Sequence, residues 1–408
     1  MKSYLVGGAV RDKLLNYPAN DRDWVVVGAT VEEMEAAGYK LVGNDFPVFL
    51  HPDTHEEYAL ARTERKSAHG YKGFSVSASP EVTLEQDLLR RDLTINAMAE
   101  DENGELIDPF NGRTDLENRV FRHVSEAFTE DPLRVLRVAR YMARYHHLGF
   151  RIAEETMSLM KDIVAQGEIQ HLVAERIWQE TDRAIGENQP QRYFQVLREC
   201  GALKIILPEV DVLFGVPQTK EYHPEIDTGI HTMMVLEQAA RLSSDNAVRF
   251  AALLHDLGKG TTPENEWPKH IGHEERGVPL VKAVCKRLKT PNPFRDLAVV
   301  VARYHLHYHR AAELRDDTFL STLENLDAFR RPERFEQFLL ACEADSRGRT
   351  GFENAAFDQP TIYRVAFAAA QKITAQPFLQ QGLKGTDIAD AIRQCRIESI
   401  KQARQPYR

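Results

Sequence analysis

The pattern of hydrophobic and polar positions changes from strand-like to helix-like about a third of the way along the 408 residues. Near the N-terminus, two short β-rich runs, YLVGG and DWVVVG, each end at glycine, and the following TVEEMEAAGY has the pattern of a capped helix. From DPLRVLRVARYMARY onward, apolar residues recur at helical spacing, and strand signals are nearly absent after residue 110. The pattern therefore predicts a small α/β head followed by a long all-helical body.

Breaks in this pattern predict four parts. We expect a head at residues 1–140, a helical neck and body at 141–222, a histidine-rich helical region at 223–350 and a helical tail at 351–408. The segment FGVPQTKEYHPEIDTG, which contains proline and glycine, is typical of a linker before the histidine-rich region. No run approaches the ~20 apolar residues of a membrane span, so we expect no membrane partner.

Charge and cysteine content narrow the class of protein. The net charge is −9, so any nucleic-acid role must depend on a local basic surface. The 4 cysteines are far apart and form no CxxC pair. We therefore expect a reduced, cytoplasmic protein without a disulfide framework or a cysteine metal site.

The opening segment MKSYLVGGAVRD suggests a phosphate-binding loop. Gly7 and Gly8 lie between a predicted strand and a predicted helix, where backbone N–H groups can approach an anion closely. Arg11, one turn into that helix, could reach the same anion. By itself, a strand–Gly–Gly–helix turn is more often only a turn.

Asp21 and Asp23 are candidates for a metal-binding pair. If they begin a strand, both side chains leave the same face, where a divalent cation such as Mg²⁺ would relieve their repulsion. Asp-x-Asp alone occurs often by chance, but next to a phosphate-type loop it favours nucleotidyl transfer. Glu57, in the strand-like HEEYALARTERK, is our candidate for a third carboxylate, with Glu56 as its rival; solvated glutamates are the simpler explanation.

The helix predicted at TEDPLRVLRVARYMARYHHLGF carries four arginines within one stripe. No acidic residue follows Asp131 on this helix, so we expect the stripe to face a polyanion. The arginines of the stripe are Arg134, Arg137, Arg140 and Arg144.

Asp131 precedes Pro132, which makes it a good N-cap for this helix. A second interpretation is that Asp131 and Arg134 together read the edge of a base. Asp accepts and Arg donates, which matches the amino donor and ring-nitrogen acceptor of cytosine and of adenine. Guanine and uracil present the reverse pattern, so such a pair would select CTP and ATP without a template.

The later segment RFAALLHDLGKG places His255 and Asp256 at the end of an apolar helix. With His231 upstream, this region resembles an HD-domain phosphohydrolase, in which His and Asp side chains hold a divalent transition metal that activates water. His273 and His305 follow it. Asp345 is a further possible ligand, although DSRGR also fits a capped turn.

Four segments in order, GGAVRD, DRDW, RRDLTINA and EDPLRVLRVAR, resemble the class II tRNA nucleotidyltransferases. These are the CCA-adding enzymes of the DNA polymerase β-like superfamily, a class that also contains bacterial poly(A) polymerases. With the HD region behind these segments, the whole chain resembles the bacterial, multifunctional form of the family. The resemblance implies an α+β multidomain fold, in which a DNA polymerase β-like head precedes an all-helical body and a helical HD domain.

The resemblance implies that CTP and ATP are used to add and repair the 3'-terminal CCA of tRNA, with release of pyrophosphate. Asp21 and Asp23 would be the catalytic, Mg²⁺-binding pair. Nucleotide contacts would come from Gly8, Arg11, Arg91, Asp131, Arg134, Arg137 and Arg140.

For the HD region, the resemblance implies phosphatase and 2',3'-cyclic phosphodiesterase activity. A Ni²⁺ or similar ion would be held by His231, His255 and Asp256. We expect a monomer or homodimer. We also expect the segment KSAHGYKGFS, from Lys66, to move during nucleotide addition.

Two other functions compete with this interpretation. A poly(A) polymerase of the same fold would be expected to be basic, whereas this chain is acidic and carries an HD unit. A signalling HD hydrolase whose head only binds nucleotide would leave the arginine stripe unexplained. A non-catalytic RNA-binding protein would have no need of Asp21 and Asp23 in this arrangement.

Overall fold

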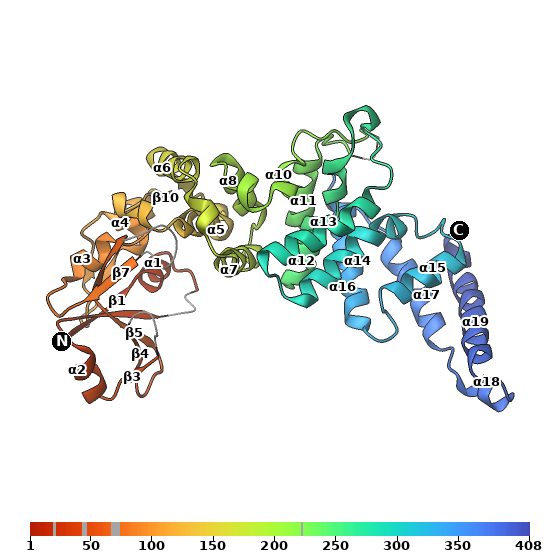
Figure 1. Cartoon of the computed structure of the whole chain (residues 1–408), viewed down its shortest axis with the longest axis horizontal. Helices are drawn as coiled ribbons and strands as arrows, with labels where there is room; N and C mark the ends of the chain where they lie inside the picture. Colours follow the sequence, from red (N-terminus) through yellow and green to blue (C-terminus); the bar gives the residue numbers. More distant parts are fainter. Residues whose placement is uncertain (19–21, 43–46, 67–73, 222) are drawn as a thin grey trace. The chain divides into compact units, whose positions relative to one another are not determined.

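The computed structural model describes residues 1–18, 22–42, 47–66, 74–221 and 223–408 (Figure 1). The chain forms two compact units. The first contains Met1–Glu180 with Gln195–Ile206, and the second contains Thr181–Phe194 with Leu207–Arg408. The division into four parts at 140, 222 and 350 stays a prediction.

A seven-stranded mixed sheet is the centre of the first unit, with strand order β3-β4-β5-β2-β1-β8-β9. The neighbours β2 and β5 are parallel, and every other neighbouring pair in this sheet is antiparallel. The strands are β1 (Lys2–Val6), β2 (Asp23–Val27), β3 (Lys40–Leu41), β4 (Val48–Leu50), β5 (Glu57–Leu60), β8 (Ala99–Glu100) and β9 (Leu106–Ile107).

Side-chain alternation along β2 builds a core on both faces of this sheet. Val25 belongs to a buried cluster with Val6 and Leu88, whereas Val26 packs on the opposite face with Phe49. Because residues two apart on a strand share a face, Asp23 lies on the Val25 side of the sheet. This placement sets the position of the carboxylate relative to the segment around Leu88.

Helices surround the sheet and continue the first unit. The predicted capped helix is confirmed as α2, where Thr30 and Glu33 form a reciprocal capping box. The helices are α1 (Gly8–Leu14), α2 (Val31–Ala36), α3 (Leu84–Leu89), α4 (Gly112–Glu117), α5 (Leu133–Tyr145), α6 (Glu154–Ala165), α7 (Ala174–Ile185), α8 (Gln191–Glu199) and α9 (Leu203–Ile206), of which α7 and α8 cross between the units.

The structure differs from the predicted strands in two places. The run HEEYALARTERK is two strands, because after β5 the chain leaves the large sheet and forms β6 (Arg62–Lys66), which pairs with β7 (Phe74–Ala78). Past residue 110, a short parallel pair is formed by β10 (Val120–Phe121) and β11 (Arg151–Ile152). The first correction concerns two strands that follow each other in the sequence, and the second concerns a pairing between segments that are farther apart.

The described part of the second unit is helical (Figure 1). Its central helices pack in layers, with α11 against α12 and α16, and with α14 against α12, α13 and α16. The helices are α10 (Pro208–Asp211), α11 (Thr228–Leu242), α12 (Asn246–Leu254), α13 (His273–Leu288), α14 (Asn292–His309), α15 (Asp316–Asn325), α16 (Pro332–Arg347), α17 (Gln359–Gln371), α18 (Gln376–Gln380) and α19 (Thr386–Arg404).

The C-terminal helix is joined to the rest of the second unit by a buried arginine. Arg404 donates to the carbonyls of Ala311 and Leu314 and pairs with Asp316 at 2.6 Å. None of the helices that the structure describes is both long and apolar enough to cross a bilayer. All 4 cysteines are free thiols in the structure.

Candidate functional site

The glycine loop of the head lies against Arg91. Gly7 has a φ of +68°, which is unfavourable for other residues, and a Cβ built on it would lie 2.8 Å from Nη1 of Arg91. A Cβ on Gly8 would lie 3.4 Å from Nη2 of Arg11. Gly7 is thus favoured by its backbone conformation, and two guanidinium groups lie directly beside the loop.

Two buried carboxylates fix the arginines around this loop. Arg11 pairs with Asp12 at 2.8 Å and donates to Oδ1 of Asn96 at 2.5 Å. Asp92, in turn, accepts from Asn96 at 2.9 Å and from Nε of Arg137 at 2.8 Å. The segment RRDLTINA therefore connects the glycine loop to helix α5 through hydrogen bonds.

The pKa of the Asp92 carboxyl is shifted by the groups that it contacts in this connection. Complete burial alone would raise the pKa of its carboxyl, but the charges of Arg137 and Arg134 and the hydrogen bonds from Asn96 and Arg137 together outweigh burial and hold that pKa well below its usual range. Asp92 is therefore ionised across the physiological pH range. Together with Asn96 it orients Arg137, a role that the sequence pattern did not reveal.

The arginine stripe of α5 is paired within the first unit. Arg137 contacts Asp92, Arg140 contacts Glu180 at 2.7 Å, and Arg144 contacts Asp12 at 3.2 Å. These acidic partners come from other segments rather than from α5 itself, so the pattern of this helix alone does not reveal them. Contact of these arginines with a nucleotide stays a prediction.

Asp131 and Arg134, the predicted base-reading pair, each contact other groups. The Asp131 carboxylate accepts from the backbone N–H of Leu133 at 3.0 Å, as a helix cap does, and pairs with Arg176 at 2.9 Å. Arg134 is buried and donates to the carbonyl of Arg90 at 2.5 Å. Arg176 was missed by the sequence interpretation, since it lies on α7, 45 residues from Asp131.

Asp23 begins β2 and is exposed beside the glycine loop. It is in register with Val6, the residue before Gly7, and on its other side with Glu57 of the parallel strand β5. In-register residues of parallel neighbours project from the same face, with strands ~4.8 Å apart. Two carboxylates thus share the face of the sheet at this edge.

Glu56, the rival third carboxylate, has a different environment. It accepts a hydrogen bond from the indole of Trp24 at 2.8 Å and lies 3.4 Å from Arg22. The geometry favours Glu57 as the companion of Asp23. Asp21 lies outside the described residues, as do residues 67–73 of the segment KSAHGYKGFS.

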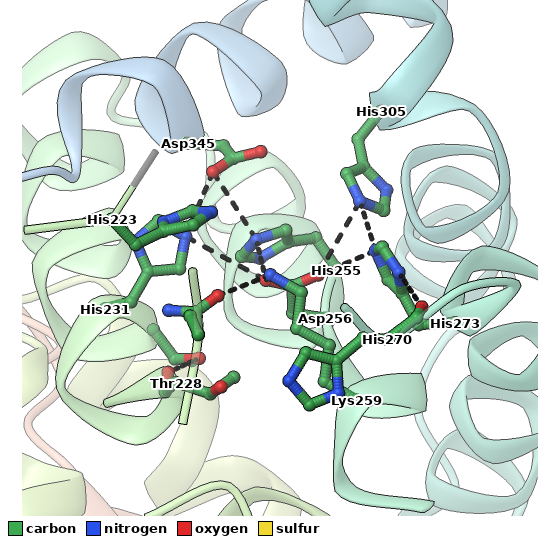
Figure 2. Close-up of polar contacts among 12 residues, drawn as sticks. His223, Thr228, His231, His255, Asp256, Lys259, His270, His273, His305 and Asp345 are labelled. Atoms are coloured by element: carbon green, nitrogen blue, oxygen red, sulfur yellow. Dashed lines mark hydrogen bonds and ion pairs between the residues drawn. The ribbon is translucent and has the colours of Figure 1, made fainter. Parts of the chain in front are cut away.

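The second unit contains a buried cluster of histidines and aspartates (Figure 2). Two groups of three buried residues each have ligand atoms that all lie within 4.8 Å of one another, and a third, partly buried group of His223, Glu225 and His231 shares His231 with the first. The first group is His231, His255 and Asp345, and the second is Asp256, His273 and His305.

Short distances connect the two groups through Asp256. Its Oδ2 lies 3.0 Å from Nε2 of His255, and its Oδ1 lies 3.2 Å from Nε2 of His273. On the other side, Oδ1 of Asp345 lies 3.1 Å from Nε2 of His231 and 3.6 Å from Nε2 of His255. The cluster contains the predicted His231, His255 and Asp256, and also the three residues that the sequence left open.

Backbone carbonyls orient the imidazole rings. Nδ1 of His231 lies 3.0 Å from the carbonyl of Gly348, and Nδ1 of His255 lies 2.8 Å from that of Ala252. A carbonyl only accepts, so Nδ1 carries the proton in the neutral ring and the lone pair of Nε2 faces the cluster. This arrangement is typical of metal-binding histidines.

Gly258 brings the chain after α12 close to α13. A Cβ on Gly258 would lie only 1.9 Å from the carbonyl oxygen of His273, so no larger residue fits without a backbone shift. The glycine of HD-x-G therefore allows a close approach of two backbones rather than supplying a left-handed helix cap. That approach places Asp256 beside His273.

The charges within the cluster shift the pKa values of its members. Burial lowers the pKa of His231, but hydrogen bonds to Asp345 and Glu225 outweigh it and raise the pKa to about 9. Burial raises the pKa of Asp345, yet the neighbouring His255 and His309 hold it well below its usual range. Asp345 is thus ionised at neutral pH.

These residues fit a divalent transition metal. Nε2 of His255 and Oδ1 of Asp256 are buried without a hydrogen-bond partner, and a cation would supply one for each. Imidazole nitrogen with carboxylate oxygen is a ligand set that suits Zn²⁺, Ni²⁺, Mn²⁺ or Fe²⁺. The structure thus supports divalent metal binding without identifying the ion.

Two further residues of the cluster's surroundings were missed by the sequence interpretation. Glu225 lies 3.1 Å from Nδ1 of His231 and so helps to orient that ring. His309 contacts Oδ2 of Asp345 at 2.6 Å and lines a pocket of about 290 Å³ with Arg310 and Gln359. His309 therefore connects the buried cluster to an open pocket.

Three family models match successive parts of the chain. The Poly A polymerase head domain matches residues 3–122, the probable RNA and SrmB-binding site of polymerase A matches 149–214, and the HD domain matches 228–340. The class of protein is therefore a polymerase-type nucleotidyltransferase head joined to an HD domain. The predicted fold class, a polymerase β-like head followed by a helical body and HD domain, is confirmed.

Relatives that match the whole chain show which family within this class it belongs to. The multifunctional CCA proteins of Thioalkalivibrio sulfidiphilus and Teredinibacter turnerae are 63% and 59% identical to this chain, with coverage of 100% and 98% of both chains. The chain belongs to the multifunctional CCA protein family. A solved CCA-adding enzyme in an apo form shares the fold at a TM-score of 0.67 and 21% identity, over 98% of this chain and 88% of that one.

Proposed function

We propose that the head adds the 3'-terminal CCA to tRNA from CTP and ATP. The observation that carries the proposal is the edge of the sheet where Asp23 and Glu57 project beside Gly7, with Arg91 and Arg11 directly behind the loop. Carboxylates for a metal and guanidinium groups for a triphosphate are the two requirements of nucleotidyl transfer. The multifunctional CCA relatives support tRNA as the acceptor.

In this proposal, Asp21 and Asp23 hold Mg²⁺, with Glu57 as third carboxylate. Mg²⁺ bound there would stabilise charge on the tRNA hydroxyl oxygen that attacks the α-phosphate and on the pyrophosphate oxygen that leaves it. Gly8 allows close approach of the triphosphate, while Arg11 and Arg91 bind its oxygens. Arg137 and Arg140, kept in orientation by Asp92 and Glu180, contact phosphate or sugar.

Base selection requires an exchange of partners at Asp131. Its carboxylate is held by Arg176, so a cytosine or adenine amino group must replace or share that contact. Arg134 would then supply the donor to the ring nitrogen. Because the pair matches both bases, the change from two cytidines to one adenosine must depend on the growing RNA end.

The proposal for the head is tested by incorporation of each labelled nucleoside triphosphate into tRNA that lacks its last three residues. We expect two C and one A from the unmodified protein, and none from an Asp21→Ala/Asp23→Ala variant. A matched control, Glu35→Gln on the exposed face of α2, should retain full incorporation. Long A tracts would indicate a poly(A) polymerase, and absence of any incorporation would overturn the proposal.

We further propose that the second unit is a metal-dependent phosphohydrolase, with phosphatase and 2',3'-cyclic phosphodiesterase activity. The buried His and Asp cluster supports this activity, since a metal held there would lower the pKa of bound water. Lys259, 2.7 Å from Asp256, adds positive charge beside the cluster. The pocket at His309 is our candidate for substrate entry.

This second activity is tested by release of phosphate from nucleoside 2',3'-cyclic phosphate and 2'-phosphate in the presence of Ni²⁺ or Mn²⁺. We expect His255→Ala/Asp256→Ala to abolish release and to retain CCA addition. His307→Ala, on α14 but outside the two ligand groups, is the control and should retain release. Equal release by the double variant and the unmodified protein would contradict the proposal.

A further inference from the structure

A basic pocket of the second unit is lined by residues of α13, α14 and α16 and of the turn after α13. Its volume is about 710 Å³, within the ~300–1,000 Å³ typical of sites for small ligands. Asp296 is the single acidic residue among the described residues that line it, whereas five lining residues are cationic. These are Lys282, Lys286, Lys289, Arg295 and Arg334. The pocket therefore carries a net charge of +4 in a chain whose net charge is −9.

The protein neutralises the cations of this pocket only in part. Asp296 pairs with Arg295 at 2.7 Å and lies 3.6 Å from Arg334, so one carboxylate serves two guanidinium groups. Lys282 and Lys286 are exposed and lie one turn apart on the same face of α13. Neither lysine has an acidic partner in the part of the chain that the structure describes. A concave surface with charge of one sign concentrates ions of the opposite sign, so the pocket favours an anion.

Lysines at the end of α13 also have a simpler explanation, because the helix dipole favours cations near a helix C-terminus. That effect accounts for Lys286 and Lys289. It does not account for Arg295 and Arg334, which lie in the first turns of α14 and α16, where the dipole disfavours a cation. Cations from three helices therefore converge on the pocket for a reason other than helix stability.

The pocket is distinct from the histidine cluster. On α13, Lys282 follows His273 by nine residues, which is ~13 Å along a helix axis. On α14, Arg295 precedes His305 by ten residues, or ~15 Å. Among the described residues, none lines both this pocket and the pocket at His309. A ligand of the basic pocket is therefore separate from an ester bound at the cluster.

The charges and walls of the pocket indicate the class of anion. Arginine binds phosphate oxygens through paired N–H groups, and lysine binds them as a point charge. The phosphates of RNA are spread along a backbone, which proteins bind in grooves that follow the strand. A di- or triphosphate group instead concentrates its charge in one place, as the cations of this pocket are concentrated. Cys285 and Val300 are buried and give the pocket an apolar wall that suits the base of a nucleotide.

We infer that the second unit binds a di- or triphosphate group in this pocket, carried by a nucleotide or free as pyrophosphate. The inference goes beyond the proposed function, and it requires neither the chemistry proposed for the head nor that proposed for the cluster. Because the two sources share the same phosphate chemistry, the test has a separate arm for each.

The test measures the rate at which individual lysines of the full chain are acetylated, read by mass spectrometry of peptides, so that nucleotide bound to the head does not enter the readout. ATP, pyrophosphate, adenosine and tRNA are compared with chelator present. With ATP or pyrophosphate at about ten times its Kd, acetylation of Lys282 and Lys286 should slow by about tenfold. Adenosine should have no effect. Lys372, exposed on the second unit and outside this pocket, should react equally in all samples.

A lysine variant tests whether the ligand occupies the pocket itself. Lys286→Gln, read at Lys282, should raise the ligand concentration for half-protection by about tenfold, because one charge-assisted contact is lost. Lys286 is exposed, so the variant should remain folded. The matched control, Lys372→Gln, should leave that concentration unchanged.

Protection by ATP alone would assign the pocket to a nucleotide, and protection by pyrophosphate alone would assign it to the free anion. Protection by both would show that the phosphate group suffices. Absence of protection by either ligand, or equal half-protection in Lys286→Gln and the unmodified protein, would overturn the inference. Protection by tRNA alone would also overturn it and would make the pocket part of an RNA-binding surface.

Discussion

The head and the histidine cluster hold their charged groups in opposite ways. In the head, carboxylates project at an exposed sheet edge, and the arginines behind them are already paired with Asp12, Asp92 and Glu180. In the HD unit the carboxylates and imidazoles are buried, and two of their atoms, Nε2 of His255 and Oδ1 of Asp256, have no hydrogen-bond partner. In the functions that we propose, the head receives a large anion from outside, whereas the cluster holds a cation.

The difference implies that the two sites respond differently to the same kind of change. Loss of a head carboxylate should remove chemistry and leave the fold intact, because Asp23 is exposed. Loss of a cation from the cluster should affect stability as well, because its ligands are buried. The predictions that follow test this contrast, from the largest expected effect to the smallest.

The largest expected effect is on nucleotidyl transfer. Asp23→Asn should lower incorporation of CMP into truncated tRNA by about three orders of magnitude, because several kcal/mol of charge stabilisation would be lost at ~1.4 kcal/mol per tenfold. Single-turnover incorporation measures this change, and thermal unfolding should be unaltered. A loss below tenfold would contradict the role of Asp23.

Removal of metal should destabilise the second unit. A ligand that binds only the folded state at 100 times its Kd stabilises that state by about 2.7 kcal/mol. We therefore expect calorimetry to show a higher melting transition for the Mn²⁺-loaded second unit than for the stripped protein. Asp345→Asn should reduce that difference, and an identical transition with and without metal would count against a resident ion.

Much of the head site could be predicted from the sequence, because its residues lie in short local motifs. Strands β1 and β2 and the glycine loop were predicted from short β-rich runs that end at glycine. The partners of the α5 arginines were not, since periodicity gives the face of a helix but not the segments that pack against it. Asp92 and Glu180 lie 45 and 40 residues from the arginines they contact.

In the HD cluster, too, only the residues that lie in a short local motif could be predicted from the sequence. His255 and Asp256 are adjacent and easily recognised, whereas Asp345 lies 114 residues from its partner His231. The sequence could not separate Asp345 from a turn residue, because only the packing of α16 against α11 brings the two together. His273 and His305 were likewise joined only by the packing of α13 against α14.

Two neighbouring glutamates, Glu56 and Glu57, can be compared to test which of them acts beside Asp23. Glu57→Gln should lower incorporation about tenfold or more, because it removes a carboxylate beside Asp23 from the metal site. Glu56→Gln, which alters only the contacts to Trp24 and Arg22, is the matched variant and should change incorporation by less than about threefold. Equal effects of the two variants would contradict the assignment of Glu57.

Arg176 should act as a positioning residue for base selection. Arg176→Ala should lower kcat/KM for CTP and ATP by about three- to tenfold, because a partly buried charge-assisted contact to Asp131 is lost. Incorporation of UTP, measured beside CTP, should rise relative to the unmodified protein. Arg176→Lys should restore part of the preference, and unchanged selectivity in Arg176→Ala would contradict this role.

The smallest expected effect concerns acid stability of the head. The pKa of Asp92 is well below its unfolded value of 3.8, so the stability that its ionised form contributes is present above pH 3.8. That contribution is lost as the pH falls through 3.8 toward the folded-state pKa. Thermal melting between pH 6 and pH 3 should therefore decline more steeply in the unmodified protein than in Asp92→Asn, and parallel curves would contradict the prediction.

The central claim is that one chain carries two separable chemistries, and one paired measurement tests it most directly. CCA addition and phosphate release are measured on the same preparations of the unmodified protein, Asp23→Asn and Asp256→Asn. We predict that Asp23→Asn loses only addition and that Asp256→Asn loses only release. Loss of both activities in either folded variant, or of neither in both, would contradict the account.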